Sequence, residues 1–286
     1  MIEVPMGGLW RDAGRRLGSN PAAGFALWAI LSVVVLALIG PWFNPNAFDA
    51  LDWAHVAVPP SFQHSHWFGT DRLGRDLFVR TLQGTRASLL IGLFASAISL
   101  LIGISYGAIA GYLGGRTDSL MMRFIELLSG LPLVFFVILV GVIFGRNEYL
   151  LYIVIGAVGW LTMARIVRGQ TLSIRRREFI EAAVASGASI GRIILKHVIP
   201  NVIGPIIVYA TLTIPQTILF ESFLSFLGLG IQEPQASLGT LIADGAGEME
   251  AAPWMLVVPG MFLATLLLCL NIFGDGLRDA LDVKER

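Results

Sequence analysis

Residues 89–113 read LLIGLFASAISLLIGISYGAIAGYL, a run of 25 residues without one charged side chain. A helix needs about 20 mostly apolar residues to cross the hydrocarbon core of a bilayer. Because this run exceeds that minimum, it predicts a membrane-spanning helix. The chain is therefore expected to be an all-α membrane protein in which other apolar runs pack against this one.

Five further segments are apolar enough, or nearly so, to cross a bilayer. The six expected spans are residues 25–43, 89–113, 127–144, 149–164, 202–220 and 254–273. The fifth span contains Gly204, Pro205 and Pro215, which membrane helices tolerate where neighbouring helices satisfy the freed backbone groups. The composition agrees, since only 14% of the residues are charged, against about 25% in a soluble domain. A mean hydropathy of +0.74 points the same way, and we expect a six-span helical bundle.

The distribution of basic residues predicts how the bundle is oriented. Lys and Arg collect in cytoplasmic loops. With a cytoplasmic N-terminus, fifteen of the 20 basic residues lie inside, and both termini are then cytoplasmic. The five that lie outside are Arg72, Arg75, Arg80, Arg86 and Arg146. The expected parts are an N-terminal segment 1–24 and a membrane domain 25–286, with outside segments 44–87 and 227–253, a cytoplasmic loop 165–201 and a cytoplasmic tail 274–286.

Several kinds of function are excluded by composition. The net charge is zero, so bulk attraction to nucleic acid is not expected. The single cysteine, Cys269, excludes a disulfide or a Cys-based zinc site within one chain. The chain has no G-x-x-x-x-G-K-[ST] loop to hold ATP phosphates. His64 and His66 alternate in a segment expected to be a loop, without a carboxylate at ligand spacing, so we expect them to be solvated or hydrogen-bonded rather than metal-bound.

The cytoplasmic loop has a pattern typical of a helical hairpin. Apolar residues recur at helical spacing at Phe179, Ile180, Ala183 and Val184. Gly187 follows where a helix end favours positive φ, and Ser189 can cap a second helix over residues 190–199 that ends at Pro200. The small residues Ala182, Ala183, Ala185 and Gly187 would allow a partner protein to approach closely. From the pattern alone, an amphipathic helix lying at the lipid headgroups fits equally well.

The same loop carries a motif of a known family. Glu181-Ala182-Ala183-x-x-x-Gly187, followed by Arg192-Ile193-Ile194-x-Lys196-His197-Val198-Ile199-Pro200-Asn201, resembles the EAA loop of bacterial ABC importer permeases. The family more often has Ile-Leu before the proline, and Val198-Ile199 keeps both positions aliphatic.

Other segments resemble the dipeptide and oligopeptide branch of those permeases, most closely its C-type membrane subunit. They are Phe68-Gly69-Thr70-Asp71-x-x-Gly74-Arg75-Asp76, Gly111-Tyr112-Leu113-Gly114-Gly115, Met163-Ala164-Arg165-Ile166-Val167-Arg168-Gly169-Gln170, Glu221-Ser222-Phe223-Leu224-Ser225-Phe226-Leu227-Gly228-Leu229-Gly230 with Gln232-Glu233-Pro234, and Gly274-Asp275-Gly276-Leu277-Arg278-Asp279-Ala280-Leu281-Asp282. The tail has Val283 where the family usually has proline. The resemblance covers the chain from the first span to its end.

The resemblance implies a type I ABC importer permease fold and a non-catalytic subunit that binds no cofactor. Its partners would be a homologous second permease, two cytoplasmic ABC ATPases that hold ATP and Mg, an extracytoplasmic peptide-binding protein, and the lipid of a bacterial inner (plasma) membrane. It implies that the ATPase is contacted by Glu178, Glu181, Ala182, Ala183, Gly187, Arg192 and Pro200. An outer gate or binding-protein contact would comprise Glu221, Phe226, Gly228, Gly230, Glu233 and Pro234, beside an outside motif of Gly69, Asp71, Gly74, Arg75 and Asp76.

Two alternatives stay open at this point. The same machine could import dipeptides, nickel complexes or glutathione instead of oligopeptides. A different class, the ion-driven transporter, places ionisable groups near the bilayer midplane. The middles of all six expected spans lack charge, which favours the ATP-driven importer.

Overall fold

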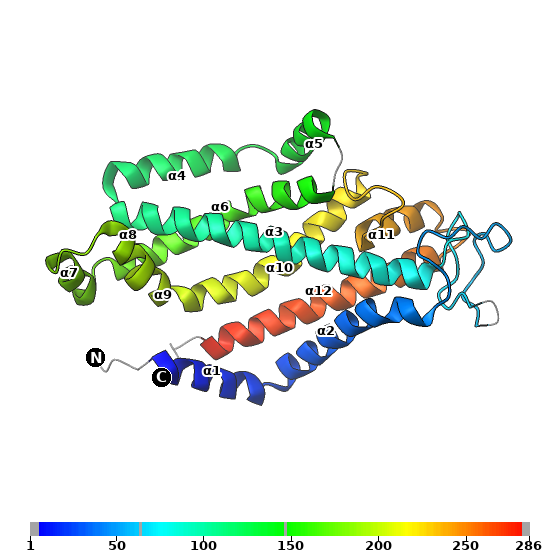
Figure 1. Cartoon of the computed structure of the whole chain (residues 1–286), viewed down its shortest axis with the longest axis horizontal. Helices are drawn as coiled ribbons and strands as arrows, with labels where there is room; N and C mark the ends of the chain where they lie inside the picture. Colours follow the sequence, from blue (N-terminus) through cyan, green and yellow to red (C-terminus); the bar gives the residue numbers. More distant parts are fainter. Residues whose placement is uncertain (1–5, 63–64, 146–147, 282–286) are drawn as a thin grey trace.

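The computed structural model describes residues 6–62, 65–145 and 148–281 (Figure 1). Expectations about His64, Arg146 and the end of the tail, residues 282–286, lie outside the described residues. The helices are α1 (Met6–Ser19), α2 (Pro21–Ile39), η1 (Gly40–Phe43), α3 (Leu77–Leu113), α4 (Gly115–Ser129), α5 (Leu133–Phe144), α6 (Glu148–Ile174), α7 (Glu178–Ala185), α8 (Ile190–Ile193), η2 (Ile194–Val198), α9 (Ile199–Asn201), α10 (Ile203–Phe226), α11 (Leu238–Gly247) and α12 (Trp254–Leu281).

The spans expected from the sequence are largely present. Among the described residues, five helical segments are long and apolar enough to cross a membrane, namely Pro21–Phe43, Leu77–Leu113, Tyr149–Ile174, Ile203–Phe226 and Trp254–Leu281. A sixth crossing exists if α4 and α5 together count as one span. Outside these helices, the described chain forms only isolated β-bridges, such as Ser61 with His66. The all-helical membrane fold is thereby confirmed.

The expected third span, residues 127–144, is not one straight helix. α4 ends at Ser129 and α5 begins at Leu133, and the two are bent by 82°. The reason lies in Pro132, which has ψ 123° and precedes the first residue of α5. Proline disfavours helical backbone in the residue before it and cannot donate its own backbone hydrogen bond. The apolar run is therefore split between the end of α4 and α5.

Helix α3 begins earlier than the sequence suggested. Residues 77–87 were expected to belong to the outside segment, but they form the first three turns of α3, which has 37 residues. At 1.5 Å per residue such a helix is about 55 Å long, well beyond the roughly 30 Å hydrocarbon core. Asp76 caps it, because the Asp76 side chain accepts a hydrogen bond from Val79 N.

The core contact of the bundle is between α3 and α6. Three glycines spaced one helical turn apart on α3, Gly103, Gly107 and Gly111, face α6. A Cβ added to Gly103 would lie 2.6 Å from the Met163 Cβ, and one added to Gly111 would lie 2.7 Å from the Thr171 Cβ. Both distances are shorter than any real Cβ contact, so the two backbones approach more closely than larger residues allow. In a membrane such small-residue contacts drive helix association, because lipid offers no hydrophobic driving force between helices.

The loops that connect the long helices lie at two opposite ends of the molecule. Figure 1 shows α1, the hairpin α7–α8 and the last turns of α12 at one end, and the loops that precede α3 together with α11 at the other. The N-terminal and C-terminal ends of the described chain thus lie at the same end as the hairpin. This arrangement agrees with termini and hairpin sharing one side of the membrane.

Candidate functional site

The hairpin predicted from the loop is present. α7 spans Glu178–Ala185, and Gly187 follows with φ +76°, as its position predicted. The α7 end is closed by backbone hydrogen bonds from Gly187 N to Val184 O and from Ala188 N to Ala183 O, 2.9 and 3.1 Å long. A left-handed residue lets the chain reverse within these few residues.

The second arm of the hairpin differs in detail from the expected helix over residues 190–199. Ser189 occupies the N-cap position of α8, but its side chain makes no capping hydrogen bond. After α8 the turns widen into the π-helix η2 and close again in α9. Pro200 lies inside α9 rather than ending the arm, which continues to Asn201.

The hairpin is rooted in the bundle by its apolar side. Ile180, Ile193 and Val198 are almost fully buried in a cluster that also contains Met163 and Val167 of α6. The other side is exposed and carries both acidic residues, Glu178 and Glu181, together with Ala182 and Arg192. Among the apolar residues expected on one face, Phe179 and Val184 stay 40% and 55% exposed. An exposed surface that combines apolar and acidic side chains suits contact with another protein.

An ion pair fastens the root of the hairpin to the start of α4. The Arg168 guanidinium donates two hydrogen bonds to the Asp118 carboxylate, from Nε to Oδ1 at 2.5 Å and from Nη2 to Oδ2 at 2.6 Å. Such paired hydrogen bonds fix the geometry as well as supplying energy. Seven residues later, Arg175 Nη1 donates to Leu113 O at the end of α3. The end of α6 that carries the hairpin is therefore held to both α3 and α4.

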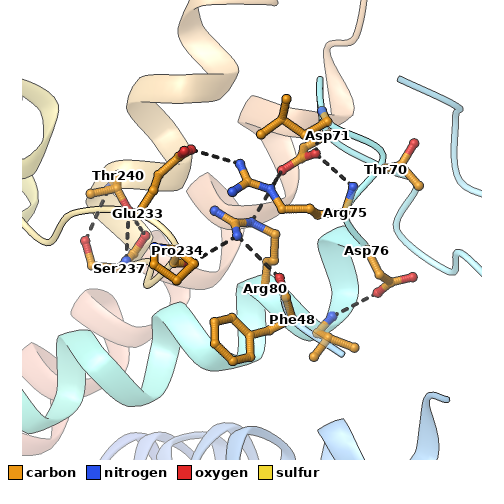
Figure 2. Close-up of polar contacts among 12 residues, drawn as sticks. Phe48, Thr70, Asp71, Arg75, Asp76, Arg80, Glu233, Pro234, Ser237 and Thr240 are labelled. Carbon is orange, nitrogen blue, oxygen red and sulfur yellow. Dashed lines mark hydrogen bonds and ion pairs between the residues drawn. The ribbon is translucent and has the colours of Figure 1, made fainter. Parts of the chain in front are cut away.

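At the opposite end, the two groups of residues expected at the outer face meet in one network (Figure 2). The buried Arg75 donates from Nε to Asp71 Oδ2 at 2.6 Å and from Nη2 to Glu233 Oε1 at 3.0 Å. Arg80 Nε lies 3.5 Å from the same Asp71 oxygen, and Arg80 Nη1 contacts the carbonyl oxygen of Pro234. Burial by itself would lower the pKa of the Arg75 guanidinium. The nearby Asp71 and Glu233 carboxylates have the larger combined effect, so this pKa is raised. The network ties the motif before α3 to the loop after α10.

The two motif glycines allow close backbone approach within this outer segment. Gly69 has φ +82°, and a Cβ there would lie 2.6 Å from the carbonyl oxygen of Val58. Gly74 has φ +75°, and a Cβ there would overlap the carbonyl group of Asp52. Both positions therefore require glycine for conformation and for space. The motif is therefore a compactly folded segment in which backbone groups contact one another closely.

Glu221, expected at an outer gate or in interhelical hydrogen bonding, is fully buried. Its carboxylate accepts hydrogen bonds from Ser88 Oγ of α3 at 3.1 Å and from Ser225 Oγ of α10 at 2.6 Å. The Ser225 hydroxyl in turn accepts one from Ser237 Oγ, at the start of α11. The geometry thus favours a structural hydrogen-bond network joining three helices.

The remaining outer residues lie at the end of α10 and in the loop after it. Phe226 is 52% exposed, Gly228 has φ +75°, and a Cβ on Gly230 would overlap the Ser225 side chain. Phe226 and Gly228 are therefore on the exposed surface, while Gly230 is buried against α10.

A groove between α6 and α10 was not foreseen from the sequence. Its volume is about 280 Å³, and its lining residues are Ile155, Val158, Gly159, Thr162, Met163, Ile166, Tyr209, Leu212, Thr213, Gln216, Thr217 and Phe220. None of these twelve residues is charged, yet several carry hydrogen-bonding groups. On α10, Tyr209, Thr213, Gln216 and Phe220 share one face because they are four, three and four residues apart. That helical spacing of polar residues inside a span is the signal that could have revealed the groove.

The polar lining has a consequence for where the groove faces. Gln216 is exposed inside a spanning helix, and its amide would face lipid unless another surface covered it. Burying an unpaired amide in hydrocarbon costs about 4–8 kcal/mol. Polar groups in spanning helices accordingly face a bundle interior or a water-filled cavity. We conclude that the α6–α10 groove faces water or another protein chain.

Comparison with known proteins places this architecture. Residues 103–286 match the sequence profile of the binding-protein-dependent transport system inner membrane component, and residues 8–60 match that of the N-terminal TM domain of oligopeptide transport permease C. The chain belongs to the family of binding-protein-dependent inner-membrane transport components. The permease is 53% identical to the oligopeptide transport system permease protein OppC of Haemophilus influenzae, over 97% of this chain and 89% of that protein.

Further relatives and a solved structure agree with this family assignment. The permease is 50% identical to OppC of Escherichia coli K12, over 100% of this chain and 94% of that protein. It is 47% identical to the dipeptide transport system permease protein DppC of Bacillus subtilis, over 96% of this chain and 86% of that one. A structure of the inward-facing MetNI methionine ABC transporter superposes with a TM-score of 0.57 at 19% identity, covering 71% of the permease and 96% of that chain, which shows the shared fold.

The family assignment decides between the classes left open by the sequence. The permease is a multi-pass inner-membrane protein and the non-catalytic membrane component of an ABC importer. The alternative of an ion-driven transporter is wrong, because the family match and the OppC relatives place the chain among ABC permease subunits.

Proposed function

We propose that the permease forms half of the translocation pathway of an oligopeptide importer. Its OppC relatives are oligopeptide transport permeases, which supports this substrate, and the α6–α10 groove supplies the physical reason. A peptide presents a backbone N–H and C=O at nearly every residue, whatever its side chains. The Thr162 hydroxyl and the Gln216 amide can donate to the C=O and accept from the N–H. The Thr213 hydroxyl, which donates to Tyr209 O, can still accept.

The absence of charge in the lining of the groove fits a peptide substrate of variable sequence. A fixed charge in a low-dielectric pathway would favour peptides of the opposite sign and oppose those of the same sign. The twelve lining residues carry no such charge. The groove therefore tolerates acidic and basic peptides equally, and selection is left to the binding protein.

A charge introduced at Gln216 tests this role. Gln216→Glu should slow the uptake of acidic peptides relative to basic ones of equal length, and Gln216→Lys should do the reverse. The control is Leu219→Ala, also exposed on α10 but outside the groove, which should leave the ratio unchanged. If both charged variants keep the wild-type ratio while uptake continues, the groove does not line the pathway.

The substrate class has its own test, because the dipeptide relative is nearly as similar as the OppC proteins. Deleting the gene should confer resistance to toxic oligopeptides and prevent growth on peptides as the only source of a required amino acid. Dipeptides, nickel complexes and glutathione are the alternatives. Normal oligopeptide uptake together with a loss of nickel uptake would move the assignment to the nickel branch.

The hairpin α7–α8 is proposed as the contact for a cytoplasmic ABC ATPase. Its exposed face carries Glu178, Glu181 and Ala182, while its buried face is continuous with α6 and α10. A homologous second permease would complete the pathway, with a second ATPase on its own hairpin. A displacement of the hairpin by ATP-driven closure would then move both helices that line the α6–α10 groove. In free-energy terms, ATP favours one of two arrangements of the bundle.

The orientation is proposed from the charge split, with the hairpin and both termini in the cytoplasm. Single cysteines at Ser61 and Gln235 should react with an impermeant thiol reagent in intact cells, in a Cys269→Ser background. A cysteine at Ser189, exposed on the hairpin, should not react. Labelling at position 189 without permeabilisation would reverse the topology. The outer network and the loop after α10 then face the binding protein.

A further inference from the structure

Three side chains of the segment before α3 converge at the outer end of the molecule. The Oδ2 atom of Asp52 lies 2.8 Å from His55 Nδ1 and 3.7 Å from His66 Nε2. One ligand atom from each residue can be chosen so that all three lie within 4.8 Å of one another. Zinc with bonds of about 2.0–2.2 Å holds neighbouring tetrahedral ligand atoms roughly 3.4 Å apart. The 2.8 Å distance from Asp52 to His55 is shorter than this value and the 3.7 Å distance from Asp52 to His66 is longer. Small side-chain movements would therefore bring the three ligand atoms to the spacing that a zinc ion needs.

The hydrogen bonding of His66 leaves one ring nitrogen directed at Asp52. His66 is 3% exposed, and its Nδ1 lies 2.8 Å from the Oδ2 atom of Asp76. Since a carboxylate accepts, Nδ1 is the donor, and in a neutral imidazole Nε2 is then an acceptor. That acceptor faces the carboxylate of Asp52, a second acceptor, and a cation between them satisfies both.

The role of Asp76 matches the outer shell of known metal sites. A metal-binding histidine usually donates its other ring N–H to a carboxylate, which fixes the tautomer and the ring orientation. Asp76 accepts from His66 through Oδ2 while its Oδ1 accepts from Val79 N at the start of α3. An ion bound to His66 would therefore be linked through Asp76 to the first turn of the longest helix.

The backbone that carries the ligands is held in place before any ion binds. Thr70 N donates to Val58 O at 3.0 Å, and Val58 N donates to the Thr70 hydroxyl at 2.8 Å. The same hydroxyl donates to His55 O at 2.5 Å. These bonds fix the segment that bears Asp52 and His55 against the segment that bears His66, so the three side chains need little reorganisation.

We propose that Asp52, His55 and His66 form a binding site for one divalent first-row metal ion, foremost zinc. Two imidazoles and a carboxylate suit zinc, and copper and nickel compete by the general order of affinities. The Asp52 and His55 side chains are 42% and 32% exposed, so a fourth position can be filled by water. The proposal differs from the expectation that His64 and His66 are solvated or hydrogen-bonded rather than metal-bound. The site could not be recognised in the sequence because His66 lies 14 residues after Asp52.

Metal binding is measured on the full-length permease, purified in detergent with its companion subunits and a histidine-free tag. After chelator treatment and desalting, zinc is titrated in competition with a chromophoric chelator, and bound metal is counted by mass spectrometry. The wild type should bind one zinc ion per chain at this site. His55→Ala should weaken that binding at least about 100-fold, and Asp76→Asn, which can still cap α3, about 10–100-fold.

The matched control is His197→Ala, which removes a histidine from the hairpin at the other end and should leave zinc binding unchanged. X-ray absorption should report two imidazole ligands in the wild type and one in His55→Ala. Melting temperatures in the absence of metal check that the variants fold. The proposal is wrong if the stripped wild type takes up no zinc, or if His55→Ala and Asp76→Asn bind it as the wild type does. Neither result depends on which substrate is transported.

Discussion

Gly187 at the bend of the hairpin offers the sharpest test of the coupling role. Its φ is +76°, and a Cβ added there would meet no atom within 4 Å. The Cβ of a valine there would therefore meet no atom of this chain, and the effect on the hairpin itself comes from the backbone. A left-handed conformation costs an L-residue roughly 1–2 kcal/mol, with β-branched residues at the upper end or beyond. We take about 2 kcal/mol for Gly187→Val.

That cost is large relative to the energy of one bend. Since 1.4 kcal/mol is a factor of ten in an equilibrium, about 2 kcal/mol disfavours the native bend roughly 30-fold against relaxed alternatives. The second arm would then leave the hairpin in a different direction. Insertion into the membrane should be normal, because Gly187 lies outside the spanning helices. Peptide uptake should fall about tenfold or more, and co-purification of the ATPase should fall with it.

A graded series separates backbone strain from other effects. Gly187→Asn should be mild because asparagine tolerates left-handed backbone, Gly187→Ala intermediate and Gly187→Val worst. The matched control is Gly191→Val, the same change four residues later, at an exposed glycine without positive φ and without an atom within 4 Å. If Gly187→Val transports and retains the ATPase as well as Gly191→Val does, the bend is irrelevant and the coupling argument fails.

Three further changes test other parts of the structure. Glu221→Ala leaves two buried serine hydroxyls without their acceptor and should lower the free energy of unfolding by about 2–5 kcal/mol. Glu221→Gln keeps an acceptor and should cost less. Equal melting temperatures for the two variants would contradict the network. Asp118→Ala removes the ion-pair partner of Arg168 and should destabilise the attachment of the hairpin to α4 by about 1–2 kcal/mol. Trypsin should then cleave faster at residues 175–177. An unchanged cleavage rate would show that the ion pair does not hold the hairpin in place. Burial raises the pKa of the Asp244 carboxyl above its ordinary 3.8, so its contribution to stability is greatest below that pH and is lost as the pH rises through the raised pKa. Asp244→Asn removes this dependence, and the melting temperature of the wild type should fall relative to the variant as the pH rises above about 4; parallel curves would argue against it.

Much of the fold follows from the sequence because membrane spans are read from apolar length. Residues 89–113 alone specify the class of fold, and the positive φ of Gly187 could be predicted from its place after a helix. The break at Pro132 was missed because a hydropathy pattern averages over one proline. The early start of α3 was missed because residues 77–87 carry arginines, whose burial depends on partners elsewhere in the chain.

The site could be predicted in part for a similar reason. The hairpin is local, so its first helix and its bend could be predicted from spacing, whereas the ATPase-contact residues were expected only from the resemblance. The pairing of Arg75 with Glu233 joins positions 158 residues apart, and no local pattern encodes it. The α6–α10 groove likewise needs two helices to meet. The cluster of Asp52, His55 and His66 depends on the folding of the outer segment around Gly69 and Gly74.

The lining of the α6–α10 groove also bears on the membrane potential. Proton pathways through membranes rely on carboxylates and imidazoles that can hold the proton in transit. The groove offers none of these groups over its twelve lining residues. An elementary charge gains about 2.3 kcal/mol per 100 mV on crossing, so a conductive wall would steadily discharge the cell. The side chains of this wall carry only hydroxyls, an amide, a thioether and hydrocarbon, so any such current would depend on water alone. Peptides can then pass while the protein side chains themselves conduct no protons.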